Sequence, residues 1–236
     1  MSRIDQTQKI IRHYYGKRGE YLQEHSDFFK TSHINKDLQF LIEALELSRQ
    51  DIILDIACGQ GRHSSALAKK GFTVDGVDFS KHLLDQTKQD CVKKHRPHYY
   101  VNNIEDLKLK DTYTKAYWFF SDLAGIDISK ALQSISHAMR QDGRVLIDTD
   151  NIYRLKSYLK RNVTTELFFD AQMSELIDKR TNIRVRYLTL SEWKQILKQT
   201  GFFVKNTFGD YSAGKYTKES PRLILILKKK RQNHKI

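Results

Sequence analysis

The chain has 236 residues, of which 39 % are hydrophobic and 29 % are charged. This balance excludes a disordered protein, and no apolar run approaches the roughly 18 residues that a membrane-spanning helix needs. The length suits one domain rather than two. The two cysteines, Cys58 and Cys91, and an N-terminal stretch without an apolar core favour neither a disulfide scaffold nor a secretory signal. We therefore expect a cytoplasmic protein that has no membrane partner.

The net charge of +13 raises the question of an anionic partner such as a nucleic acid. Five basic residues lie among the last nine positions: Lys228, Lys229, Lys230, Arg231 and Lys235. Many of the others are scattered singly over expected helix faces, which is typical of a solvated surface. The distribution of charge therefore makes a nucleic-acid partner the less favoured alternative. We interpret residues 229–236 as a disordered basic tail.

From residue 35 onward, helical and strand patterns alternate. Apolar periodicity and flanking turn signals predict helices over 36–47, 62–70, 81–95 and 128–140. Asn35 is a candidate cap for the first of them. Short apolar runs predict strands over 52–57, 72–77, 98–101, 116–120 and 144–149. Five strands separated by helices indicate a parallel sheet covered on both faces, and such sheets bind ligands at the carboxyl ends of their strands.

The pattern changes after residue 150. We expect an insertion over about 152–188, in which 166–188 forms either a hairpin or one strand with irregular flanks. The remaining elements are a helix capped by Ser191 and ended by Gly201, and the strands 202–208 and 222–227. The predicted fold is therefore α/β, with five parallel strands and a final hairpin in one seven-stranded sheet whose last strand is antiparallel.

The sharpest functional signal is a glycine turn between the first strand and the next helix, in the sequence ILDIACGQGRHSS. Gly59 and Gly61 allow a tight turn and let a ligand approach backbone amides, and the start of the following helix is positive. Asp78 ends the second strand, where its carboxylate can accept both hydroxyls of a ribose held over the turn. The turn therefore indicates a cofactor that contains a nucleoside.

Two residues separate the classes of cofactor that use this geometry. A dinucleotide site needs a third glycine or alanine in the pattern G-x-G-x-x-G, and Ser64 occupies that position here. Asp55, inside the first strand, is a poor neighbour for a pyrophosphate and suits an uncharged or cationic cofactor. The sequence therefore disfavours NAD.

The same stretch resembles motif I and its acidic partner in the class I S-adenosylmethionine-dependent methyltransferases. It combines the strand acid, the turn ACGxGxxS and the segment VDGVDFS. The variant CGxGRH and the ending GDYSAGKYTKESPRLILILKK resemble one bacterial branch of small-molecule methyltransferases. The resemblance implies a Rossmann-like methyltransferase sheet, S-adenosylmethionine as cofactor and S-adenosylhomocysteine as its product.

The resemblance also implies which residues bind the cofactor. They are Asp55, Ala57, Gly59, Gly61, Asp78, Phe79, Asn103, Ile104 and Phe119. Within this set, Asp78 would hold the ribose, and Phe119 would face the methyl group of the donor. The family commonly has an acid at the position of Asn103, where an asparagine oxygen can still accept a hydrogen bond from adenine. Arg62 either binds the methionine carboxylate or faces solvent.

Methyl transfer is an in-line displacement that depends mainly on alignment and on exclusion of water, so it requires no catalytic dyad. If the acceptor must lose a proton, candidate bases are Asp122, Asp150 and Tyr15. Tyr15 lies in residues 1–34, an aromatic segment that we expect to form a lid ahead of the methyltransferase domain at 35–228. Neither cysteine has metal-ligand spacing, so we predict no metal site and a packing role for both.

These features predict an enzyme that moves a methyl group to nitrogen or oxygen of a small metabolite. Two alternatives remain. An RNA methyltransferase is favoured by the net charge and disfavoured by the lack of an appended RNA-binding module. A non-catalytic protein that binds S-adenosylmethionine as a partner or sensor is the other.

Overall fold

The computed structural model describes residues 3–24, 31–87, 96–121, 123–161 and 166–231. Its strands are β1 (Ile52–Ile56), β2 (Thr73–Asp78), β3 (His98–Val101), β4 (Tyr113–Trp118), β5 (Met139–Asp150), β6 (Leu167–Asp170), β7 (Glu175–Asp178), β8 (Arg184–Arg186), β9 (Phe202–Phe208) and β10 (Arg222–Lys229). Its helices are α1 (Arg3–Tyr14), α2 (Tyr21–Glu24), α3 (Thr31–Leu45), α4 (Arg62–Lys69), α5 (Lys81–Asp85), α6 (Ile128–Ala138), α7 (Ile152–Arg161), α8 (Leu190–Gln199) and the short 3-10 helix η3 (Ile104–Asp106).

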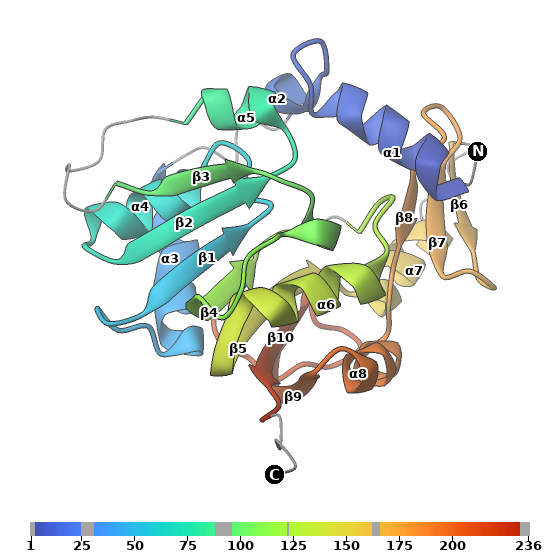
Figure 1. The fold of residues 1–236 in the computed structure, drawn as a ribbon. Coiled ribbons are helices and arrows are strands. Elements are labelled where there is room, and N and C mark those ends of the chain that lie inside the picture. Colours follow the sequence, from blue (N-terminus) through green and yellow to red (C-terminus); the bar gives the residue numbers. More distant parts are fainter. Residues whose placement is uncertain (1–2, 25–30, 88–95, 122, 162–165, 232–236) are drawn as a thin grey trace.

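Seven strands form one sheet in the order β3-β2-β1-β4-β5-β10-β9 (Figure 1). The five strands from β3 to β5 are parallel to one another, and β10 is antiparallel to both β5 and β9. The chain order reverses beside β1, so the ends of β1 and β4 face a crevice in which such sheets bind ligands. The predicted fold class, including the antiparallel last strand, is confirmed.

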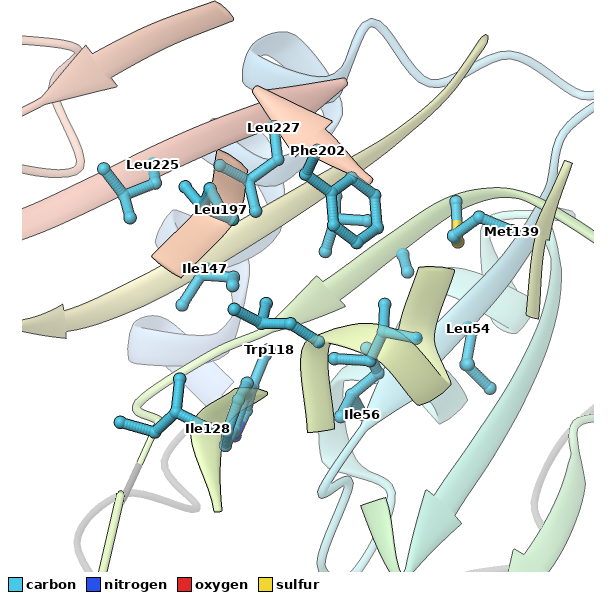
Figure 2. Close-up of a cluster of buried hydrophobic side chains, with 14 of the residues drawn as sticks. Leu54, Ile56, Trp118, Ile128, Met139, Ile147, Leu197, Phe202, Leu225 and Leu227 are labelled. Atoms are coloured by element: carbon cyan, nitrogen blue, oxygen red, sulfur yellow. The ribbon is translucent and has the colours of Figure 1, made fainter. Parts of the chain in front are cut away.

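Helices cover both faces of the sheet because successive strand residues point to opposite sides. On β1, Ile53 joins a buried cluster that includes Leu41 of α3 and Leu67 of α4. Its neighbour Leu54 joins a second cluster, which includes Ile135 of α6 and packs around β4, β5 and α8 (Figure 2). Each such buried side chain stabilises the fold by roughly 1.5–3 kcal/mol. The two clusters fix the strands whose ends carry the site.

Three helix boundaries differ from those predicted. α3 begins at Thr31, so the prediction of Asn35 as its cap is wrong. The cap of α8 is Thr189 rather than Ser191, because the Thr189 hydroxyl accepts a hydrogen bond from Glu192 N–H while the Glu192 carboxylate accepts one from Thr189 N–H. This reciprocal capping box satisfies two backbone donors at once. α5 ends at Asp85, well before the predicted end at residue 95; residues 88–95, including Cys91, lie outside the described residues.

The last strand is longer than predicted, because β10 continues past Leu227 to Lys229. The buried Lys229 ammonium donates a hydrogen bond to the Met139 carbonyl at 2.6 Å. Arg231 extends these contacts through an ion pair with Asp142 at 3.0 Å. The expectation of a disordered tail from residue 229 is therefore wrong for its first three residues, and the rest of the tail lies outside the described residues.

The expected insertion after β5 contains α7 and a separate antiparallel sheet of three strands, β6, β7 and β8 (Figure 1). The alternative of a hairpin was therefore the better interpretation, although it missed the third strand. Within the described residues, none of the helices has the length and apolar character of a membrane span.

Candidate functional site

A cavity lies at the carboxyl ends of β1, β2 and β4, and residues of α1 form part of its wall. Its lining includes eight residues that the sequence predicts to bind the cofactor: Asp55, Ala57, Gly59, Asp78, Phe79, Asn103, Ile104 and Phe119. Gly61 belongs to the same turn but does not line the cavity. Residues from four separate segments of the chain thus meet at the edge of the sheet where ligand binding was expected.

The two glycines of the turn have different surroundings. Both have a left-handed backbone, with φ of 56° at Gly59 and 65° at Gly61, a conformation that disfavours side chains. A β-carbon on Gly59 would meet only a Leu83 methyl group, at 3.9 Å, whereas one on Gly61 would lie 2.4 Å from the Tyr99 hydroxyl. Gly59 therefore leaves space at the cavity, and Gly61 leaves space for Tyr99 within the fold.

Asp78 lies at the end of β2 and is 6 % exposed. One carboxylate oxygen accepts a hydrogen bond from Gly59 N–H at 2.8 Å and the other accepts one from Ser80 N–H at 2.8 Å. Burial raises the pKa of Asp78, and these backbone donors oppose the rise. Each oxygen has a second lone pair, so the carboxylate retains acceptor capacity that suits two ribose hydroxyls.

Asp55, at the end of β1, is buried in the cavity wall. Its carboxylate accepts a hydrogen bond from Ser64 N–H at 3.2 Å, at the start of α4. Burial raises the pKa of Asp55 from 3.8 to about 7. The neighbouring Tyr117 hydroxyl, Ser64 and Arg62 partly offset this rise in the pKa of Asp55. A buried carboxylate in these surroundings favours a cationic ligand group, such as the ammonium of an amino acid.

Asn103 and Glu105 form the rim beyond β3. The Asn103 side-chain oxygen accepts a hydrogen bond from Glu105 N–H at 3.0 Å and so caps η3. Its second lone pair is the one that adenine could use, and that role stays a prediction. The Glu105 carboxylate accepts hydrogen bonds from Asp127 N–H and from Gln8 of α1. The sequence interpretation missed Glu105 and Gln8 because these contacts join distant segments.

The end of α1 is attached to the loop after β2. The Ser80 hydroxyl donates a hydrogen bond to the Tyr15 carbonyl at 2.7 Å, and the Tyr15 ring meets the Phe79 ring edge-on at 5.8 Å. Arg12 lies over the same Phe79 ring. Tyr15 and Tyr21 line the cavity, and the role of their segment as a lid stays a prediction. Arg12 was missed, and the helical spacing of the buried residues Thr7 and Ile11 is the signal that indicates α1.

The predicted bases are not all in the cavity. Tyr15 lines it, and Asp122 lies outside the described residues. Asp150 is not among the lining residues; its side chain is 53 % exposed and forms an ion pair with Arg222. The role of Asp150 as a base stays a prediction that this position does not favour.

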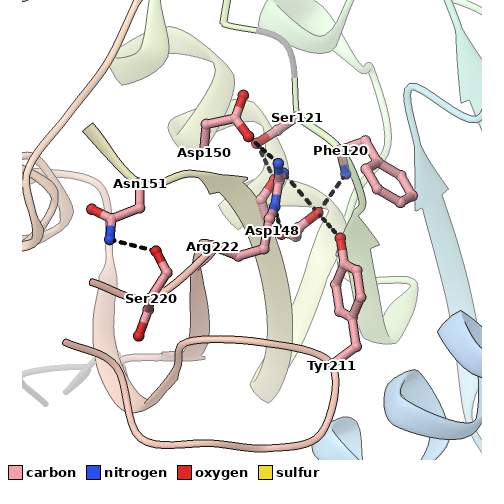
Figure 3. A network of polar contacts seen from close by, with 8 residues as sticks. All are labelled: Phe120, Ser121, Asp148, Asp150, Asn151, Tyr211, Ser220 and Arg222. Carbon is pink, nitrogen blue, oxygen red and sulfur yellow. Dashed lines mark hydrogen bonds and ion pairs between the residues drawn. The ribbon is translucent and has the colours of Figure 1, made fainter. Parts of the chain in front are cut away.

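Beside Asp150, a polar network joins β5, β10 and the residues after β4 (Figure 3). Its centre is the fully buried carboxylate of Asp148, which accepts hydrogen bonds from Phe120 N–H and the Tyr211 hydroxyl, each at 2.9 Å. The Arg222 guanidinium donates two more, at 2.9 and 3.1 Å. These contacts fix the backbone of Phe120, which lines the cavity and has a left-handed φ of 49°.

A buried contact between a histidine and a carboxylate forms another part of the cavity wall. His63, in the first turn of α4, lines the cavity, and its Nε2 atom lies 3.1 Å from the carboxylate of Asp37 on α3. Arg62 also lines the cavity, with its guanidinium 5.2 Å from the centre of the Phe120 ring. Both alternatives for Arg62, binding of the methionine carboxylate and exposure to solvent, stay predictions. The pairing of His63 with Asp37 was not foreseen.

The sheet order and the glycine turn define a Rossmann-like fold, in which two carboxylates lie at the ends of β1 and β2. Comparisons with known proteins extend this conclusion. Residues 53–143 match the sequence profile of a family described as a methyltransferase domain. A ubiquinone biosynthesis O-methyltransferase of Hydrogenovibrio crunogenus is 26 % identical over 162 residues, which cover 66 % of this chain and 64 % of that protein.

Solved structures give the same fold. An S-adenosylmethionine-dependent methyltransferase of Clostridium acetobutylicum has a TM-score of 0.71 at 18 % identity, covering 89 % of this chain and 99 % of that one. The 1,6-didemethyltoxoflavin-N1-methyltransferase of Burkholderia thailandensis, solved with 1,6-didemethyltoxoflavin and S-adenosylhomocysteine, has a TM-score of 0.62 at 14 % identity, covering 98 % and 92 %. Together with the family match, these findings confirm the predicted enzyme class, a methyltransferase, and its predicted cofactor, S-adenosylmethionine.

Proposed function

We propose that this enzyme transfers the methyl group of S-adenosylmethionine to nitrogen or oxygen of a small molecule. The observation that carries the proposal is that a single cavity contains both the carboxylates at the ends of β1 and β2 and the aromatic residues that follow β4. The former suit the donor, and the latter, Phe119 and Phe120, suit a small and partly apolar acceptor. Residues of α1 complete the wall.

In this proposal, the residues of β1 and β2 bind the donor. Asp78 accepts hydrogen bonds from the two ribose hydroxyls, and Asp55 faces the ammonium of the methionine part. Phe79 and the Asn103–Ile104 segment lie on either side of adenine. When bound, S-adenosylmethionine supplies a methyl group activated by its sulfonium.

Other residues of the cavity wall orient the acceptor and shield the site from water. Phe119 and Phe120 exclude water from the methyl group, and Tyr15 packs on Phe79 as part of the lid. Holding a nucleophile in line with a reacting bond supplies most of the acceleration that such a transfer needs. The network around Asp148 contributes by fixing the backbone position of Phe120.

The test uses S-adenosylmethionine labelled in its methyl group. In one reaction, the protein and the labelled donor are incubated with a deproteinised small-molecule extract of a cell culture. In a parallel reaction, they are incubated with total RNA from that same culture. We expect label in one or a few small molecules, whose masses and fragmentation distinguish N-methyl from O-methyl products. Asp78→Asn serves as the control with impaired donor binding. Label confined to RNA would overturn the proposal in favour of an RNA methyltransferase, which is the alternative that the net charge of +13 favours.

A further inference from the structure

We propose that His63 takes the proton that the methyl acceptor loses, and that Asp37 is the positioning residue that orients it. The inference deepens the proposed function and rests on it. His63 follows the glycine turn directly, so α4 holds its imidazole in the wall of the cavity. The side chains of His63 and Asp37 are 7 % and 8 % exposed, and the 3.1 Å contact joins α4 to α3.

The contact with Asp37 determines which nitrogen of the imidazole can accept a proton. A carboxylate only accepts hydrogen bonds, so Nε2 carries the hydrogen and donates it to Asp37. In the neutral ring the lone pair then lies on Nδ1. A carboxylate that orients the ring in this way also stabilises the imidazolium formed after proton uptake.

The imidazole also lies beside the expected position of the acceptor. Its ring centre is 5.3 Å from that of Phe119, the residue expected to face the methyl group, and 6.4 Å from that of Phe120. The Phe120 ring is nearly parallel to it. An acceptor atom held between these rings and the donor is therefore within reach of the imidazole.

The groups around His63 favour its neutral form at pH 7. Burial lowers the pKa of His63, which the hydrogen bond to Asp37 partly offsets. Arg62 on the same helix lowers the pKa further, and the Asp148 carboxylate on β5 raises it. Tyr117 of β4 contacts the ring edge-on at 6.4 Å. A neutral imidazole at working pH is the form that a general base needs.

The proposed transfer conserves electrons and protons. The bond between the methyl carbon and the donor sulfur breaks, and its electron pair stays on sulfur as the neutral thioether of S-adenosylhomocysteine. A lone pair of the acceptor nitrogen or oxygen forms the new bond to the methyl carbon. The acceptor proton moves to Nδ1 of His63, and His63 later releases it to water.

A purely structural role, in which the pair only joins α3 to α4, predicts different behaviour. His63→Gln separates the two roles, because the glutamine amide can still donate a hydrogen bond to Asp37 but cannot take up a proton. Asp37→Asn is the matched variant: its side-chain oxygen still accepts from Nε2, but the charge that stabilises the imidazolium is gone.

The experiment measures initial rates of labelled small-molecule product from pH 6 to 10, together with S-adenosylhomocysteine affinity by calorimetry. General bases contribute about 100-fold or more to rate. We expect His63→Gln to lose about 100-fold at pH 7 while keeping its affinity for S-adenosylhomocysteine within about threefold. The deficit should shrink as the pH rises, because the acceptor then ionises without help. Asp37→Asn should lose less, about tenfold.

A second measurement does not depend on activity. In nitrogen-detected NMR of the cofactor-free protein, His63 should be neutral at pH 7 with hydrogen on Nε2, and Asp37→Asn should lower its pKa. A His63→Gln variant that is as active as the wild type, or a His63 that is charged at pH 7, would overturn the proposal. A wild type that labels no small molecule would instead be a failure of the proposed function.

Discussion

Asp55 and Asp148 are both buried carboxylates near the carboxyl ends of parallel strands, yet their surroundings differ. Asp148 accepts hydrogen bonds from a backbone N–H, a tyrosine hydroxyl and the Arg222 guanidinium, so the fold itself compensates its charge (Figure 3). Asp55 accepts a hydrogen bond from Ser64 N–H at 3.2 Å, and burial raises its pKa to about 7.

A structural carboxylate is distinguished from a ligand-binding one by the partners that compensate its charge. Removing a charge from water costs several kcal/mol, and this cost must be offset by partners in the fold or by a bound molecule. Asp148 has its partners in the protein. Asp55 lines the cavity, and Tyr117, Ser64 and Arg62 offset the effect of burial on its pKa only in part, so a further partner is expected from the ligand. The variants below test this contrast.

The largest expected effect is on stability at the network. Arg222→Met leaves the fully buried Asp148 carboxylate without its cation, and breaking a buried pair in this way costs about 3–5 kcal/mol. Urea unfolding measures the loss. The control is Asp150→Asn, where the ion pair is half exposed and contributes at most about 1 kcal/mol. Equal effects of the two changes would show that Asp148 is not the centre of the network.

Asp55→Asn should increase the free energy of unfolding rather than decrease it. In the unfolded chain Asp55 ionises near its ordinary pKa of 3.8, whereas the folded protein holds the proton up to about pH 7. Its contribution to stability is therefore complete below pH 4 and is lost as the pH rises through 7. At pH 8 the variant should be more stable than the wild type by up to about 4 kcal/mol, with no difference below pH 4. Unfolding curves of both proteins across this pH range check this expectation. A stability difference between variant and wild type that does not vary with pH would contradict it.

The two glycines of the turn provide a smaller contrast. Gly61→Ala combines a left-handed backbone with a close approach to the Tyr99 ring, so we expect a loss of about 2–3 kcal/mol in thermal or urea unfolding. Gly59→Ala has only the backbone cost, about 1 kcal/mol, but should weaken cofactor binding because it faces the cavity. The interpretation of these positions fails if Gly61→Ala is the better tolerated of the two.

The smallest effect is expected at the end of β10. Lys229→Met removes the hydrogen bond to the Met139 carbonyl, at a cost of about 1 kcal/mol. Lys230→Met, at an exposed position, should change the unfolding free energy by no more than about 0.5 kcal/mol. Equal unfolding free energies of the two variants would show that Lys229 behaves as a solvated tail residue.

The parts of the molecule that sequence could predict are those that one local pattern decides. The alternation of strands and helices, the turn at Gly59 and the acid at Asp78 are all of this kind. The pairing of His63 with Asp37 could not be predicted, because it joins two helices that meet only through the packing of α3 and α4 on the sheet. The same holds for Gln8, whose side chain donates a hydrogen bond to the carbonyl of Gly125, 117 positions further along the chain.

Lys229 shows a second reason for failure. Lys229 lies in a run of lysines that is typical of a solvated surface, and the positions of the Met139 carbonyl and the Asp111 carboxylate make its buried ammonium favourable. The cap of α8 is a different case, because the sequence TLSE contains the capping box and so indicates Thr189 as the cap from local pattern alone.

The most direct test of the account is calorimetry with two ligands that differ in one part. S-adenosylhomocysteine has adenine, ribose and an amino acid end, whereas 5′-methylthioadenosine lacks the amino acid. Asp78→Asn should weaken both ligands by about 10–100-fold, because both present a ribose to that carboxylate. Asp55→Asn should weaken S-adenosylhomocysteine by a similar factor and leave 5′-methylthioadenosine within about threefold. Wild-type affinity for S-adenosylhomocysteine in both variants would contradict the claim that these carboxylates bind the donor.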